Sequence, residues 1–208
     1  MTARQPTGGR LGAVVQIRSS STRLPNKAFS AVDGMPVFEL IARRLNRSQF
    51  IDGFVFATSD DESDDELHLS LKRSGFAVHR GPLENVYERT VSAALREGFD
   101  TVVRIPGDKP LVDPGLIDST ITEHLASNAH YTCNFSRQHP EELWIPRGFE
   151  VEVVSTAALM ELRSLDMTSA EQEHVTLAFR RLVQSDVRFV KLWQELPEID
   201  YPNLSLDS

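Results

Sequence analysis

Residues 11–27 read Leu-Gly-Ala-Val-Val-Gln-Ile-Arg-Ser-Ser-Ser-Thr-Arg-Leu-Pro-Asn-Lys, an apolar run that passes directly into a basic segment. The apolar part is typical of a buried β-strand. The twelve residues from Gln16 to Lys27 carry three permanent positive charges and four hydroxyl groups. Cationic side chains and loop backbone N–H groups bind phosphate in many proteins. The segment therefore predicts an anion-binding loop suited to a triphosphate, with the charged donors Arg18, Arg23 and Lys27.

A second interpretation of these charges is a solvated basic loop, the usual role of an isolated cluster of arginine and lysine. Two features favour anion binding instead. Pro25 lies between the charged residues and restricts the loop backbone, and the apolar strand before Arg18 fixes the point at which the loop begins. We therefore interpret the loop as the main binding feature of the chain.

The overall composition describes an acidic protein large enough for one sizeable domain. Its 208 residues are 40% hydrophobic, which provides for a substantial core. Lysine and arginine number 22 against 30 aspartate and glutamate residues, giving a net charge of -8. Nucleic acid and acidic membranes are poor partners for such a surface. The basic loop is a local exception, which favours a small anionic ligand.

The single cysteine, Cys133, excludes an internal disulfide and a cysteine-based zinc site, and cytoplasm is the expected compartment. Residues 1–10 are polar and contain Pro6 and two glycines, so we expect a disordered leader before a domain covering residues 11–208. No run of about 18 apolar residues occurs, so no membrane span is predicted.

Apolar runs of strand length alternate with helical patterns through the first two thirds of the chain. The expected strands cover residues 12–17, 53–57, 76–79, 101–105 and 131–135, and the expected helices cover residues 36–45, 64–72, 86–95 and 114–125. Asp113 and Pro114 are typical of a helix start, and Gly75 and Gly98 of helix ends. The alternation predicts an α/β fold with a mostly parallel mixed sheet flanked by helices.

The last third is less regular. We expect an acidic loop at residues 138–144, a strand at 149–154, a helix at 170–183 and a strand at 187–192. No internal repeat, low-complexity tract or linker separates this region from the rest, so a single domain is predicted.

The ends of two strands predict where a ligand binds. In open α/β sheets ligands bind beyond the carboxyl ends of the strands, where the strand order reverses. With the common order 3-2-1-4, strands 1 and 4 are neighbours, so Asp108 after strand 4 is expected to face the basic loop. A carboxylate near a triphosphate is a typical Mg²⁺ ligand, because Mg²⁺ uses one or two carboxylates plus phosphates and water. The alternative is that Gly107 and Asp108 only begin a turn.

Residues 18–27 resemble, position by position, the R-x-G-S-T-R-L-P-G-K signature of the sugar cytidylyltransferases. The spore-coat-polysaccharide type is the most similar branch, and its relatives make CMP-activated Kdo, sialic and pseudaminic acids. The resemblance extends from about residue 11 to 207 and implies a Rossmann-like nucleotide-diphospho-sugar transferase domain. Ser20 and Asn26 replace family glycines, so we expect a stiffer loop or a slightly different path.

The resemblance also implies which residues bind the nucleotide and which bind the metal ion. The implied nucleotide-binding residues are Arg18, Ser21, Arg23, Lys27, Thr58, Ser59 and Arg80. The family motif G-D-x-P makes Asp108 a Mg²⁺ ligand, and a C-terminal motif makes Asp207 its second carboxylate. Lys109 replaces the usual cysteine, aspartate or glutamate, which changes metal affinity or adds a phosphate contact. The resemblance also places residues 87–89, with Arg89, among the elements that line or brace the nucleotide pocket. Read without the resemblance, Thr58 and Ser59 are simply a helix N-cap, Arg89 is a solvated helix residue, and Asp207 belongs to a loose tail.

Two later segments are candidates for the acceptor side. Glu150 and Glu152 alternate with apolar residues and are expected to share one face of a strand, where two close carboxylates are costly unless they bind something. Residues 173–176 match the family's E-H-V-T element, so His174 is a candidate for hydrogen bonding the acceptor or acting as a base. Its alternative role is structural. The acidic run at residues 60–66 is interpreted as a helix N-terminus rather than a calcium site.

The resulting prediction is a Mg²⁺-dependent nucleotidyltransferase that transfers CMP from CTP to a sugar acid or related acceptor and releases pyrophosphate. Arg18, Lys27 and Asp108 are its predicted catalytic residues. Alternatives are a transferase that uses another nucleotide or a sugar phosphate or phosphonate acceptor, and a catalytically weak nucleotide-binding partner subunit. Homodimers are common among the relatives, so a homodimer is expected from the resemblance alone. No dinucleotide, P-loop or zinc-protease motif occurs.

Overall fold

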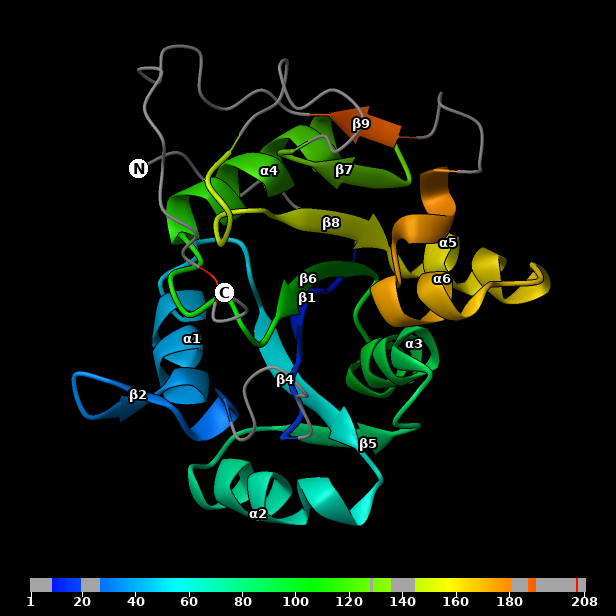
Figure 1. Ribbon diagram of the computed structural model, residues 1–208. Helices are drawn as coiled ribbons and strands as arrows, with labels where there is room; N and C mark the ends of the chain where they lie inside the picture. The colour runs from blue at the N-terminus through cyan, green and yellow to red at the C-terminus, as the bar shows by residue number, and fades with distance from the viewer. Residues whose placement is uncertain are drawn as a thin grey trace.

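The computed structural model describes residues 9–19, 27–127, 129–135, 145–180, 187–189 and 205. Within these residues seven strands form a sheet in the order β5-β4-β1-β6-β8-β7-β9 (Figure 1). The strands are β1 (Leu11–Gln16), β4 (Gly53–Ser59), β5 (Val78–Gly81), β6 (Thr101–Pro106), β7 (Tyr131–Cys133), β8 (Glu152–Ser155) and β9 (Val187–Phe189). Neighbouring strands are parallel except where β8 runs against β6 and β7. The predicted fold class is therefore confirmed.

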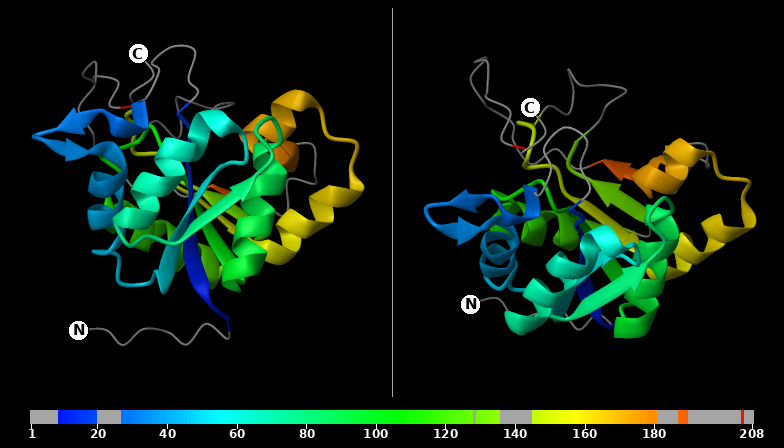
Figure 2. Two further views of the ribbon diagram at one scale, coloured as in Figure 1. Left: turned by 90° about the horizontal axis from the view of Figure 1, so that it is seen from below. Right: turned by 60° about the horizontal axis from the view of Figure 1, so that its bottom comes forward.

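Helices cover both faces of this sheet. The α-helices are α1 (Val37–Leu45), α2 (Asp65–Arg73), α3 (Val86–Glu97), α4 (Pro114–Ala126), α5 (Thr156–Glu161) and α6 (Ser169–His174). Short 3-10 turns are η1 (Lys27–Phe29), η2 (Glu62–Asp64), η3 (Leu162–Ser164) and η4 (Leu177–Arg180). Helices α1 and α4 lie on one side of the sheet and α3, α5 and α6 on the other (Figures 1 and 2). None of the helices in the described ranges is long and apolar enough to cross a membrane.

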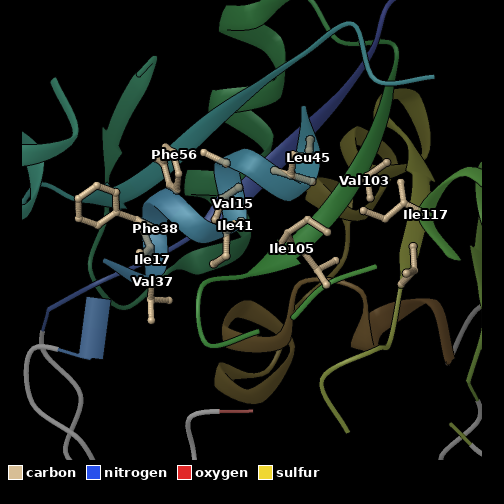
Figure 3. Close-up of a cluster of buried hydrophobic side chains, with 14 of the residues drawn as sticks. Val15, Ile17, Val37, Phe38, Ile41, Leu45, Phe56, Val103, Ile105 and Ile117 are labelled. Atoms are coloured by element: carbon tan, nitrogen blue, oxygen red, sulfur yellow. The ribbon is translucent and has the colours of Figure 1, made fainter. Parts of the chain in front are cut away.

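Each face of the sheet has its own apolar core. Side chains of β1 alternate between them, with Ala13 and Val15 on the α1 and α4 face and Val14 on the α3 face. The first core contains Ile41 of α1 and Ile117 of α4 packed against the strands (Figure 3). Burying each such side chain stabilises the fold by roughly 1.5–3 kcal/mol. These two cores fix the strand ends from which the binding loops leave.

The order of the first four major strands follows the sequence-based expectation. They lie as β5-β4-β1-β6, which is the predicted 3-2-1-4 arrangement. The helix boundaries also have the expected local causes. Asp113 caps α4 by accepting a hydrogen bond from the backbone N–H of Leu116, and Pro114 begins the helix. Gly98 ends α3 with a φ of 67°, a left-handed conformation that favours glycine.

The start of the first helix differs from the expectation. A two-stranded hairpin of β2 (Ala31–Val32) and β3 (Met35–Pro36) precedes α1, which begins at Val37 rather than Pro36. The turn between the two strands contains Asp33, whose φ is 50°. The hairpin projects from the body of the protein (Figure 2). The two strands are too short to give a period-two pattern in the sequence.

Further corrections concern the ends of the domain. Arg10, assigned to the leader, belongs to the fold: its backbone N–H donates to Asp100 at 2.7 Å and its guanidinium lies over the Phe99 ring. The helix expected at residues 170–183 begins at Ser169 but ends at His174, because the backbone of Val175 has a φ of 52°. The expected loop at residues 138–144 lies outside the described residues, as do residues 181–183 and 190–192.

Candidate nucleotide-binding site

The loops after β1 and β6 meet because the two strands are parallel neighbours. Gln16 and Pro106 are paired at the carboxyl ends of these strands, and the N–H of Gly107 donates to the carbonyl of Gln16 at 2.7 Å. A Cβ atom on Gly107 would lie 2.7 Å from that carbonyl oxygen and 2.8 Å from Cβ of Ile17. Only glycine permits this approach without a shift of the backbone. The site is thus built on two rigid strand ends.

Lys27 and Asp108 come together at this junction. The Nζ atom of Lys27 lies 3.8 Å from Oδ2 of Asp108, and each side chain is 16% exposed. Together with Arg18 they line a cavity, whose other lining residues are Gln16, Ile17, Val86, Arg89, Arg104, Pro106, Gly107, Glu173 and His174. The structure confirms the prediction that Asp108 lies close to residues of the basic loop. The catalytic roles of these residues stay predictions.

Ser21 and Arg23 of the basic loop, predicted to bind nucleotide, lie outside the described residues, as do Ser20 and Asn26. The part that is described is anchored by Asp64, which is fully buried. Asp64 accepts hydrogen bonds from the backbone N–H of Ser19 at 2.6 Å and of Ser59 at 3.0 Å. Asp64 thereby joins the loop after β1 to the end of β4.

The acidic run at residues 60–66 does begin a helix, as expected. The side chain of Asp64 within this run is buried and not solvated. Asp61 is the cap, since its side chain accepts from the N–H of Ser63 at 2.9 Å. The alternative that Thr58 and Ser59 form the N-cap is therefore wrong. The hydroxyl of Ser59 instead donates to Asp64. Residues 60–66 thus combine a helix start with a buried anchor for the binding loop.

The predicted nucleotide ligands Thr58, Ser59 and Arg80 do not line this cavity. Thr58 and Ser59 are fully buried at the end of β4. Arg80 forms an ion pair with Asp65 at 2.6 Å, and its guanidinium donates at 2.8 Å to the carbonyls of Ser59 and Asp61. Arg80 therefore braces the segment between β4 and α2. The geometry supports an indirect contribution of these three residues to the site.

Arg89 lines the cavity, in agreement with the element that the resemblance implies and against the alternative of a solvated helix residue. It is only 2% exposed, and Nη1 donates to the carbonyl of Pro82 at 2.8 Å. Its Nε atom is buried and has no hydrogen-bond partner among the residues that the structure describes. Burial lowers the pKa of the guanidinium, whereas the charge of Asp64 raises it. The spacing from Val86, three residues earlier on a buried helix face, is the signal that places Arg89 inside.

Glu152 is the centre of a buried polar network beneath the cavity. Its carboxylate forms an ion pair with Arg104 and accepts hydrogen bonds from the hydroxyls of Tyr131 at 2.7 Å and Thr176 at 2.5 Å. Arg104 in turn donates to the side chain of Gln16 at 3.0 Å. Burial raises the pKa of Glu152, but Arg104 and the hydroxyl donors lower it more, to about 2. The carboxylate is therefore ionised and held within the protein.

The expectation that Glu150 and Glu152 share a strand face is wrong, because β8 begins at Glu152. Glu150 precedes the strand and forms a separate ion pair with Lys109 at 3.0 Å. It also accepts a hydrogen bond from the N–H of Gly148 at 2.7 Å. Burial raises its pKa, but Lys109 and the backbone donors lower it overall. Neither glutamate lines the cavity, so direct contact with an acceptor is not supported for either one.

His174 does line the cavity, and it precedes a rare backbone turn. Val175 has φ 52° and ψ −65°, and the N–H of Thr176 donates to the carbonyl of His174 at 2.5 Å. This is a γ-turn with positive φ, which is strained for a β-branched residue. Such conformations cost of the order of 1–3 kcal/mol. A hydrogen bond to a charged group, such as that from Thr176 to Glu152, contributes about 1.5–3 kcal/mol.

Of the two predicted metal ligands, Asp108 is the one that lies in the part of the chain that is described. Asp207, the predicted second ligand, lies outside it, and the described residues contain no group of three or more metal-binding side chains. The carboxylate of Asp108 at this cationic cavity nevertheless fits Mg²⁺, which commonly uses one or two protein carboxylates and takes its remaining ligands from phosphates and water. Asp108 is thus a suitable protein ligand for a metal that arrives with a nucleotide.

A cationic loop after the first strand, beside an aspartate after its parallel neighbour, is the arrangement of a nucleotide-binding α/β domain. Solved structures with similar folds are nucleotidyltransferases. Residues 13–190 match the family model described as Cytidylyltransferase. The chain belongs to this family.

Curated relatives agree with that assignment. The chain is 33% identical over 172 residues to the spore coat polysaccharide biosynthesis protein SpsF of Bacillus subtilis (strain 168), covering 80% of this chain and 68% of the relative. It is 30% identical over 118 residues to 3-deoxy-manno-octulosonate cytidylyltransferase of Geobacter sulfurreducens, covering 56% of this chain and 45% of that enzyme. The chain therefore spans less than half the length of the second relative.

Two solved structures illustrate the fold. A cytidylyltransferase from Leptospira borgpetersenii serovar Hardjo-bovis superposes with a TM-score of 0.77 at 25% identity, covering 87% of this chain and 76% of that chain. A CMP:2-keto-3-deoxy-manno-octonic acid synthetase complexed with CTP gives a TM-score of 0.68 at 16% identity, covering 87% and 89%. The second likeness concerns the fold alone.

Proposed function

We propose that the protein transfers CMP from CTP to a sugar acid or related acceptor, with release of pyrophosphate. The observation that carries the proposal is the meeting of Arg18, Lys27 and Asp108 at one cavity between neighbouring strand ends. Cations at this place neutralise phosphate charge, and the carboxylate provides a ligand for Mg²⁺. Membership of the cytidylyltransferase family favours CTP among the nucleotides.

In the proposed reaction a hydroxyl oxygen of the acceptor attacks the α-phosphorus and its proton leaves to solvent, while the bond from that phosphorus to the bridging oxygen of pyrophosphate breaks. Arg18 and Lys27 hold the phosphates and balance the charge that moves onto the leaving pyrophosphate. Bound Mg²⁺ would supply additional neutralisation of phosphate charge, with Asp108 as its protein ligand. Most of the acceleration then comes from positioning and electrostatics.

The acceptor is assigned to the part of the cavity that Glu173 and His174 line. His174 offers ring nitrogens that bind a hydroxyl or carboxylate of the acceptor. Glu150 and Glu152 are assigned supporting positions, since their carboxylates already have protein partners. In this proposal Arg18 and Lys27 bind the nucleotide, whereas Glu173 and His174 contact the acceptor.

The experiment is a pyrophosphate-release assay with Mg²⁺ and each of CTP, UTP, ATP and GTP, over a panel of sugar acids, sugar phosphates and phosphonates. We expect release with CTP and a sugar acid, and none without an acceptor. A mock preparation from host cells that lack the protein, purified in the same way, controls for contaminating enzymes. Binding of CTP without release from any acceptor would contradict the proposal and support a nucleotide-binding partner subunit. Release with another nucleotide would correct the base specificity.

A further inference from the structure

The turn that follows α6 is tied to the interior of the sheet by one side chain. Thr176 donates its hydroxyl to Oε1 of Glu152 at 2.5 Å, and both residues are buried. Two residues earlier in the chain, His174 is exposed and lines the cavity. The strained Val175 lies between them, with its side chain buried in the core on the α3 face. The exposed residue His174 is thus joined, through the strained Val175, to Thr176, which is anchored in the interior.

The anchor is itself fixed from several directions. Glu152 begins β8, Tyr131 donates to it from β7, and Arg104 pairs with it from β6. Arg104 also lines the cavity and holds the side chain of Gln16 at the end of β1. Through Arg104 and Thr176, the carboxylate of Glu152 therefore connects the ends of β1 and β6 to the segment that carries His174. A strained turn persists only where its surroundings determine it in this way.

We propose that Glu152 and Thr176 are positioning residues that hold the turn at Val175 and so fix His174 against the cavity. The inference rests on the proposed function for its kinetic consequence, but the position of His174 is a property of the protein alone. It assigns Glu152 a role through another residue rather than through contact with the acceptor. In this proposal the hydroxyl group of Thr176 holds the turn through its hydrogen bond to Glu152, and the β-branched shape of the side chain is not sufficient.

The variants that separate these roles are Thr176→Val and Thr176→Ser. Valine keeps the shape of the side chain but removes the hydroxyl donor, whereas serine keeps the donor. Thr122→Val is a matched control, because the Thr122 hydroxyl donates only to a backbone carbonyl on the exposed face of α4. Thermal unfolding of every variant establishes that it is folded at the assay temperature.

The decisive measurement is the ¹H–¹³C spectrum of the histidine rings in the ligand-free protein, with His174→Ala identifying the relevant signal. We expect Thr176→Val to move or broaden the His174 signal, and Thr176→Ser and Thr122→Val to leave it in place. The signal of His79, which is hydrogen-bonded to Ser92 elsewhere in the fold, is expected to stay unchanged. An unaltered His174 signal in Thr176→Val would overturn the inference, whatever the enzyme's activity.

Kinetics with the acceptor found in the pyrophosphate-release panel supply the second readout. Loss of a hydrogen bond to a charged group predicts a fall of about 10- to 100-fold in kcat/KM for the acceptor, with Kd for CTP unchanged. The double variant Thr176→Val/His174→Ala is expected to be no slower than His174→Ala, because both act through one group. Additive losses would contradict positioning through His174. A panel with no active acceptor would refute the proposed function, while the spectra still decide the position of His174.

Discussion

The ammonium group of Lys27 lies 3.8 Å from the carboxylate of Asp108, although the two residues follow different strands of the sheet. The pair unites a cation for phosphate with a carboxylate for a metal at one cavity. Its geometry depends on Gly107, whose backbone packs against Gln16 and Ile17. The consequences of this arrangement for CTP chemistry can be measured residue by residue.

Replacing Lys27 by methionine should reduce kcat/KM for CTP by about 10² to 10³, since a preorganised charged donor to the phosphates is lost. Methionine retains most of the length of the side chain without its charge. Lys72→Met, on the exposed end of α2, is the matched control and should leave the kinetics unchanged. Steady-state pyrophosphate release measures both. Equal kcat/KM in the Lys27 variant and the wild type would exclude a phosphate contact.

Replacing Arg89 by methionine should weaken CTP binding by about tenfold or more, because a buried cation at the cavity is removed. The change also leaves the carbonyl of Pro82 without its donor, which should cost about 1–3 kcal/mol of stability. Isothermal titration with CTP and Mg²⁺ tests the first effect and urea unfolding the second. Arg73→Met, on the surface of α2, serves as control. A lower stability with an unchanged Kd would make Arg89 purely structural.

Asp64→Ala should both destabilise the protein and disturb the nucleotide site. Two backbone N–H groups, those of Ser19 and Ser59, lose their acceptor, which predicts a cost of roughly 2–4 kcal/mol in the free energy of unfolding. The loop after β1 also loses its connection to β4, so KM for CTP should rise. Glu66→Ala, an exposed change two residues later in α2, should alter stability by less than about 0.5 kcal/mol. Similar effects of both changes would contradict an anchoring role.

Glu152 should make the protein sensitive to acid. Burial raises its pKa, but Arg104, Thr176 and Tyr131 bring it down to about 2, below the ordinary carboxyl value. Its contribution to stability is therefore complete above about pH 5 and is lost as the pH falls toward 2. At neutral pH this contribution is on the order of 3 kcal/mol. Urea unfolding of the wild type and Glu152→Gln should show a difference that shrinks between about pH 5 and pH 3. A constant difference would contradict this linkage.

The sequence predicts the part of the site that depends on local pattern and strand order. Lys27 and Asp108 each follow an apolar run, so the order of the strands is enough to bring them together. Glu152 illustrates what local patterns miss. Its partners Arg104, Tyr131 and Thr176 are distant in sequence, and only the packing of β6, β7, β8 and the segment after α6 brings them to one carboxylate.

The residue pattern alone, read without the family resemblance, does not predict the burial of Arg89 or the turn at Val175, and the physical reasons differ. An arginine is usually exposed, so composition places it on a solvated face, whereas the close packing of α3 on the sheet buries this one. Val175 continues an apparently helical pattern, and no residue type such as glycine or proline announces the turn. Tertiary hydrogen bonds hold that turn, and a single sequence does not report them.

Pyrophosphate release from CTP, Mg²⁺ and the acceptor by Asp108→Ala is the most direct test of the account. Asp108 lies against Lys27 at the cavity, and its removal takes away the proposed metal ligand. The rate should fall by about 10² to 10³ relative to the wild type, while Glu161→Ala, an exposed change on α5, should keep the full rate. Wild-type turnover by Asp108→Ala would contradict the proposed site.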